Sequence, residues 1–195
     1  IGSLSLGVKI GETYTDYSQG SVRQTGGTYD LALSGSGFFA VSVTDKAGEV
    51  HTRYTRDGRF HLTKDGLLVD ADGNAVQGQN GNITIDPSSK NVSISATGQI
   101  TADGELVDTL NIVDFEDYDY LKKYGDTMYE PVDGATTKDA EGEILQGYTE
   151  QSNVNVVREM VDMITITRAY EAGQKVIRSY DSMLDKSVNQ VGALK

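Results

Sequence analysis

Residues 153–191 read NVNVVREMVDMITITRAYEAGQKVIRSYDSMLDKSVNQV, and this stretch decides the fold. It contains no proline and no cluster of turn formers, so it predicts one continuous helix. Asn153 or Asn155 can cap its start by accepting a hydrogen bond from an unpaired backbone N–H, and Gly192 is the expected stop. A helix from Asn155 to Val191 would be about 55 Å long, whereas a compact domain of about 150 residues has a radius of gyration of only ~15 Å.

An apolar stripe follows this helix in steps of three and four residues, and we call it the apolar seam. It predicts packing against another helix in a coiled coil or bundle, although the helix could instead fold back across its own chain as a core helix. Burying one large apolar side chain is worth about 1.5–3 kcal/mol, so an uncovered seam would forfeit several kcal/mol and a partner is expected. Besides Gly173, the seam contains Met163, Ile166, Tyr170, Ile177, Tyr180, Leu184, Val188 and Val191.

Upstream of the helix the pattern changes to short alternating segments separated by Gly, Asn and Asp, which predicts strands and hairpin turns. We therefore expect a mainly β protein, with a small antiparallel β domain at 1–148 and a C-terminal helical assembly segment at 149–195. A short helix is predicted over Glu116–Lys123 and an exposed loop over Asp133–Glu143. The expected strands include Leu31–Leu33, Phe38–Val43, Leu67–Val69, Ile83–Ile85, Val92–Ile94 and Leu110–Val113.

Composition excludes several classes of function. The net charge of −12 disfavours nucleic acid and anionic membranes, and no apolar run reaches the ~20 residues of a membrane helix. The absence of cysteine removes thiolate chemistry and disulfides. Asp70–Asn74 resembles the start of a calcium loop, but its twelfth position is Gly81, so a turn is expected and no metal.

Enzyme readings find little support in the sequence. His51 and His61 flank one predicted hairpin and have no serine nucleophile at motif spacing, so we expect no catalytic residues and no cofactor. The 29 acidic residues could still place a carboxylate pair at glycosidase distance by chance. A carbohydrate- or peptidoglycan-binding, or wall-cleaving, β domain with a helical tether is therefore the alternative function.

Three passages resemble the rod and hook proteins of the bacterial flagellum. DLALSGSGFFAV at Asp30–Val41 is similar to their DLAI-G-GFF-V signature, and YTRDGRF at Tyr54–Phe60 is similar to their YTRDGxF hairpin. LQGYTEQSNVNVV, continuing to Glu171, resembles their QGYxExSNVNVVEEMVxMIxxxRAYE passage, with Arg158 where the family usually has an acid. The matching positions include Gly35, Gly37, Phe38, Phe39, Tyr54, Arg56, Gly58, Phe60, Gly147, Tyr148, Ser152, Asn153 and Asn155.

The resemblance implies a structural rod subunit that polymerises into a helical axial tube and transmits torque from motor to hook. The chain has little room for the extra domain of hook proteins, so it resembles a rod protein. Both the distal-rod (FlgG) type and the proximal-rod (FlgF) type share these motifs, and the FlgG type is the first choice and the FlgF type the second. Implied partners are copies of itself, other rod and hook axial proteins and the type III export apparatus. The implied location is the flagellar basal body outside the cytoplasm, reached without a cleavable signal peptide. Family members carry an N-terminal helix that pairs with the C-terminal one, and we expect such a helix to be missing before Ile1.

Overall fold

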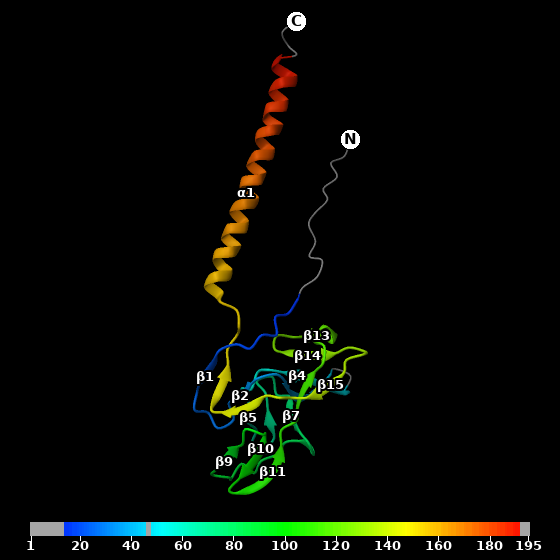
Figure 1. Ribbon diagram of the computed structural model, residues 1–195, viewed down its shortest axis with the longest axis vertical. Helices are drawn as coiled ribbons and strands as arrows, with labels where there is room; N and C mark the ends of the chain where they lie inside the picture. Colours follow the sequence, from blue (N-terminus) through cyan, green and yellow to red (C-terminus); the bar gives the residue numbers. More distant parts are fainter. Residues whose placement is uncertain (1–13, 46–47, 192–195) are drawn as a thin grey trace. The chain divides into compact units, whose positions relative to one another are not determined.

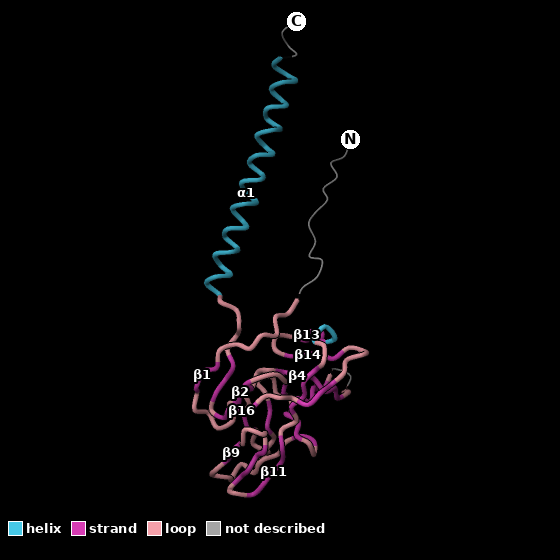
Figure 2. The backbone as a smooth tube through the Cα atoms, viewed as in Figure 1, coloured by secondary structure: helices cyan, strands magenta, loops and turns pink. Residues whose placement is uncertain are grey.

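The computed structural model describes residues 14–45 and 48–191, the side chains of Gln190 and Val191 excepted. The chain divides between Asn153 and Val154 into two compact units, a β unit and a helical unit. Short strands joined by loops build the β unit, and one long helix builds the other (Figures 1 and 2). The predicted mainly β fold with a long C-terminal helix is therefore confirmed.

The largest sheet of the β unit is built around a hairpin of β3 (Phe38–Thr44) and β4 (Val50–Thr55), which pair over six residues each. β12 (Ile112–Phe115) joins β3 to β15 (Thr137–Asp139), and β8 (Gly81–Asn82) extends β7. All pairings are antiparallel. The main path runs β13 (Leu121–Tyr124), β14 (Met128–Pro131), β4, β3, β7 (Ala75–Gly78), β6 (Leu68–Val69), β5 (His61–Leu62).

Three smaller sheets complete the β unit. One contains β9 (Val92–Ile94), β10 (Gln99–Ala102) and β11 (Glu105–Thr109). The second pairs β2 (Leu31–Ser34) with β16 (Glu143–Gln146), and the third pairs β1 (Val22–Gln24) with β17 (Tyr148–Glu150). The last two pairings bring the end of the unit back to its beginning.

β3 is buried on both faces because its side chains alternate between two hydrophobic clusters. Phe39 and Val41 belong to the larger cluster, whereas Phe38 packs with Phe115 and Leu121 in the smaller one. The two consecutive phenylalanines therefore pack on opposite faces of the same sheet.

Three local predictions were wrong or incomplete. Glu116–Lys123 is not one helix: Asp117 caps a single 3₁₀ turn, η1 (Tyr118–Tyr120), and the chain then turns extended into β13. Asp133–Glu143 is not all loop, because β15 pairs with β12. Ile83–Ile85 forms only an isolated bridge, although both isoleucines are fully buried. In the first two cases pairing with a second strand overrode the local pattern, whereas Ile83 and Ile85 still share backbone hydrogen bonds with Val76, Leu68 and Gly66.

The helical unit consists of α1 (Val156–Lys186) followed by a π-helical turn, η2 (Ser187–Val191). None of the residues of α1 is buried. The predicted stop, Gly192, lies outside the described residues. Over the described part of the chain, a helix with the length and apolar character needed to cross a membrane is not found.

Candidate functional site

The three sequence motifs of the β unit meet at Arg56, just after β4. Its Nη1 donates hydrogen bonds to the carbonyl oxygens of Gly35 and Gly37, each at 2.8 Å, and its Nε donates to Glu150 Oε2 at 3.0 Å. The Arg56 and Glu150 side chains are only 21% and 11% exposed. A guanidinium suits this position because its planar fork reaches several acceptors at once.

Glu150 also forms a hydrogen bond with the N-terminal part of the chain. Its other oxygen, Oε1, accepts a hydrogen bond from the backbone N–H of Gly20 at 2.9 Å. A Cβ at Gly20 would lie 1.7 Å from the carbonyl oxygen of Gln151, so only glycine allows this approach. Residues 14–21, which we call the entry segment, are thus held directly against the strand that leads to the helix.

Asn153 and Asn155 lie on either side of the boundary between the β unit and the helical unit. Asn153 Nδ2 donates to the carbonyl oxygens of Asp16 and Ser18, both at 3.0 Å, and contacts Ser18 Oγ at 3.1 Å. Asn155 Oδ1 instead accepts from the backbone N–H groups of Val157 and Arg158, both at 3.1 Å, and so caps α1. Of the two predicted caps, Asn155 is the one the structure uses.

The entry segment packs against an aromatic cluster through Tyr17. The ring of Tyr17 lies 4.9 Å from that of Tyr118, 5.3 Å from that of Tyr129 and 6.3 Å from that of Phe38, measured between centroids. Aromatic pairs at these separations are favourable beyond the area they bury. Tyr17 and its role were not identified from the sequence, because no local pattern singles it out.

The other motif positions serve the core or the turns. Phe60 meets Phe39 edge to face at 5.3 Å, and the ring of Tyr54 packs on Phe115 at 4.9 Å. A Cβ at Gly58 would lie 1.8 Å from the carbonyl oxygen of Leu31. The remaining positions lie beside β17: Gly147 accepts hydrogen bonds from the backbone of Thr25 and Gly26, Tyr148 pairs with Gln24, and Ser152 is exposed.

A buried carboxylate in β12 was also missed. Asp114 Oδ1 accepts from Phe115 N–H at 2.8 Å and Tyr118 OH at 2.7 Å. Lys138 Nζ lies 3.1 Å from Oδ2 and forms an ion pair with it. Burial raises the pKa of Asp114, but contacts with Tyr118, Phe115, Ser36 and Lys138 lower it more, so the net shift is downward. Burial and the neighbouring Asp114 raise the pKa of Tyr118 to about 12.

The seven described side chains of the apolar seam are all exposed, by 62% to 71%. The side chain of Val191 lies outside the described part of the chain. Exposed apolar area on this scale usually marks an interaction surface. The same face carries Met163, Ile166, Tyr170, Ile177, Tyr180, Leu184 and Val188.

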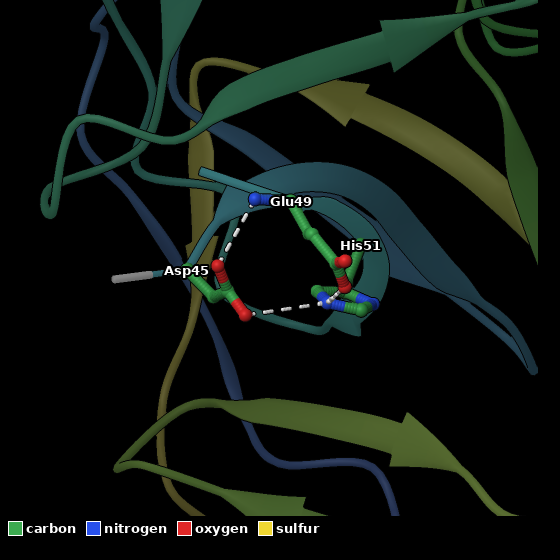
Figure 3. Close-up of side chains that lie close together, drawn as sticks. All are labelled: Asp45, Glu49 and His51. Carbon is green, nitrogen blue, oxygen red and sulfur yellow. Dashed lines mark hydrogen bonds and ion pairs between the residues drawn. The ribbon is translucent and has the colours of Figure 1, made fainter. Parts of the chain in front are cut away.

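Two polar features of the β unit remain. Figure 3 shows Asp45, Glu49 and His51, whose possible ligand atoms lie within 4.8 Å of one another. His51 Nε2 lies 3.6 Å from Asp45 Oδ2 and 3.8 Å from Glu49 Oε2, long contacts across the end of the β3–β4 hairpin, and we assign no metal to them. A half-open groove of about 520 Å³ is lined by groups such as Thr97, Asn111 and Lys138, and none of its lining residues is aromatic.

Comparisons with known proteins match both units. The family described as "Flagellar hook protein FlgE/F/G D1 domain" matches residues 32–102, and that described as "Flagellar basal body rod FlgEFG protein C-terminal" matches residues 145–191. The chain is 36% identical to the flagellar basal-body rod protein FlgG of Buchnera aphidicola subsp. Schizaphis graminum, covering 94% of this chain and 73% of that protein. It is 32% identical to FlgG of Bacillus subtilis (95% and 74% covered) and 34% identical to FlgF of Caulobacter vibrioides (92% and 72%).

Proposed function

This chain belongs to the FlgE/F/G family of flagellar basal-body rod proteins and is a structural rod subunit, and we propose that it acts by polymerising through its apolar seam. In this proposal α1 packs against helices of neighbouring subunits in a coiled-coil-like arrangement. Repeated head-to-tail contacts of this kind generate an open helical assembly, the geometry of an axial tube that can transmit torque. The partners are copies of the chain and other rod and hook axial proteins.

The exposed seam is the observation that carries this proposal. Seven large apolar side chains stay in water along one face of α1 and η2, and covering each is worth about 1.5–3 kcal/mol. The β unit, by contrast, encloses its own core of residues such as Phe39, Leu68 and Ile83. The unit that lacks a core is therefore the one that needs partners.

The family also bears on location and chemistry. The location in the flagellar basal body follows from the relatives. Export by the flagellar type III apparatus without a cleaved signal peptide, and a position outside the cytoplasm, belong to our proposal, as does the absence of any catalytic role. The carbohydrate-binding or wall-cleaving alternative is not supported, because the relatives are rod proteins.

Among rod proteins we place the chain in the distal-rod (FlgG) type first and the proximal-rod (FlgF) type second. Relatives of both types match over most of the chain, at 36% for one FlgG and 34% for one FlgF. Introducing the chain separately into cells that lack one or the other protein tests this choice. Restored motility in the FlgF-deficient cells alone would reverse the order.

The test of polymerisation uses a matched pair of substitutions on α1. Ile177→Asp places a charge in the seam, whereas Ser182→Asp places the same charge on an exposed residue outside it. We expect Ile177→Asp to abolish incorporation into isolated rods while the β unit melts within a few degrees of wild type, and Ser182→Asp to incorporate normally. Normal incorporation of Ile177→Asp would refute the proposal, and a large fall in the melting temperature of the β unit would assign the seam to its core.

A further inference from the structure

The side chain of Asn153 holds two backbone carbonyl groups at once. Both carbonyls belong to the entry segment, and an internal turn presents them together: the backbone N–H of Ser18 donates to Asp16 Oδ1 at 2.9 Å. This turn leaves the oxygens of Asp16 and Ser18 each 3.0 Å from the same Nδ2. A primary amide has two N–H donors, so a single carboxamide can serve both acceptors.

These contacts lie at one end of a longer run of hydrogen bonds between residues 16–24 and residues 148–153, which we call the zip. β1 and β17 pair over three residues, Gly20 N–H reaches Glu150 Oε1 at 2.9 Å, and Gln151 N–H donates to the carbonyl of Ser21 at 2.8 Å. Asn153 adds bonds beyond the last backbone pair. Because the strands are antiparallel, Asp16 and Asn153 lie at the same end of this pairing. Of these contacts, those of Asn153 lie farthest from the β1–β17 pairs.

Only Val154 separates this clamp from the cap of α1. Asn153 acts through its N–H donors, whereas Asn155 acts through its acceptor oxygen. An aspartate has no donor when ionised but is as good an N-cap as asparagine. The same substitution is therefore predicted to have opposite consequences at two positions that are two residues apart.

We propose that Asn153 is a positioning residue that couples the entry segment to the start of the helical unit, so that load arriving along α1 is shared by both strands of the zip. This load-sharing role of Asn153 rests on the proposed rod function. Without the clamp, a pull on α1 would reach the entry segment only through β17 and the bonds of Glu150 and Gln151 to Gly20 and Ser21. With it, the pull is also resisted by the entry segment and by the seating of Tyr17 among Phe38, Tyr118 and Tyr129.

The experiment compares Asn153→Asp with Asn155→Asp in the full chain, using hydrogen exchange of the amides of residues 16–21. Asn153→Asp loses both donors and sets a charge against two carbonyl oxygens, so we expect exchange to speed up about tenfold or more in this segment while the core strands stay protected. Asn155→Asp is expected to leave exchange there unchanged. Asp16→Ala, which breaks the internal turn without touching Asn153, should reproduce the effect and guards against a variant that misfolds. Wild-type protection of the entry segment in Asn153→Asp would overturn the coupling.

A second arm asks whether the coupling matters for the rod. Cells that carry only the Asn153→Asp protein are expected to incorporate less of it into isolated rods and to swim more slowly, whereas Asn155→Asp cells behave as wild type. Fast exchange with wild-type incorporation and swimming would overturn the positioning role and leave the rod role intact. Failure of the rod role shows separately, as normal incorporation of Ile177→Asp.

Discussion

Arg56 and Glu150, 94 residues apart in the chain, form a partly buried ion pair in which Nε lies 3.0 Å from Oε2. The pair joins the end of β4 to β17, and the remaining hydrogen bonds of Arg56 hold the turn that precedes β3. The entry segment is attached to the same carboxylate through Gly20. One guanidinium therefore joins the turn before β3, the end of β4 and β17.

Replacing Arg56 by lysine is expected to destabilise the β unit by about 1–3 kcal/mol, because an ammonium keeps the charge but cannot reach all three acceptors. The free energy of unfolding in urea measures the effect. Arg59→Lys is the matched control: Arg59 is 63% exposed and pairs with Asp57 at the surface, so about 0.5 kcal/mol or less is expected. Equal losses at the two positions would show that the fork geometry at Arg56 is unimportant.

A second prediction concerns the close approach of Gly20 to Gln151. Gly20→Ala would force the two backbones apart, since the added Cβ meets the Gln151 carbonyl oxygen at 1.7 Å. We expect a loss of about 1–3 kcal/mol together with faster hydrogen exchange in β1 and β17. Ser21→Ala removes only an exposed hydroxyl contact and should stay within about 0.5 kcal/mol of wild type. A neutral Gly20→Ala would mean that the two segments separate freely.

The helix and its cap could be predicted because their signals are local. The steps of three and four residues, the absence of proline and the capping chemistry of Asn155 all lie within one stretch of chain. The domain limits of 1–148 and 149–195 stay a prediction, as does the contact role of the seam.

The clamps could not be predicted because each joins residues that are far apart. The YTRDG motif marks Arg56, but nothing near it indicates Glu150, and Asn153 meets Asp16 across 137 residues. The error at Glu116–Lys123 arises nearer by, in the pairing of two successive strands. Tyr118 and Leu121 have helical spacing, yet Leu121 pairs with Pro131 in a hairpin whose register depends on the second strand.

The burial of Tyr118 and its contact with Asp114 predict alkaline sensitivity. The pKa of Tyr118 is raised from 10.0 to about 12, so the folded state holds its proton more tightly than the unfolded state. Its contribution to stability is complete below about pH 10 and is lost as the pH rises through about 12. Urea unfolding across this range should show wild type losing stability and Tyr118→Phe, which has no proton to lose there, losing less. Tyr120→Phe, at an exposed ring, should follow wild type; if Tyr118→Phe also does so, the contact does not carry the effect.

Replacing Gly173 is expected to have opposite effects on the free helix and on the assembled helix. It lies in the interior of α1, where alanine is favoured over glycine by about 1 kcal/mol, and an added Cβ meets nothing of the described chain within 4 Å. In the free protein, Gly173→Ala should therefore raise the melting temperature of the helical signal in circular dichroism. The same Cβ lies on the apolar seam between Tyr170 and Ile177, where a closely packed neighbour would have to move away. We expect the variant to be more helical yet to incorporate less well into rods, whereas Ser182→Ala, outside the seam, should incorporate normally. A Gly173→Ala protein that gains helix and also assembles better would show that no neighbour approaches α1 closely at this residue.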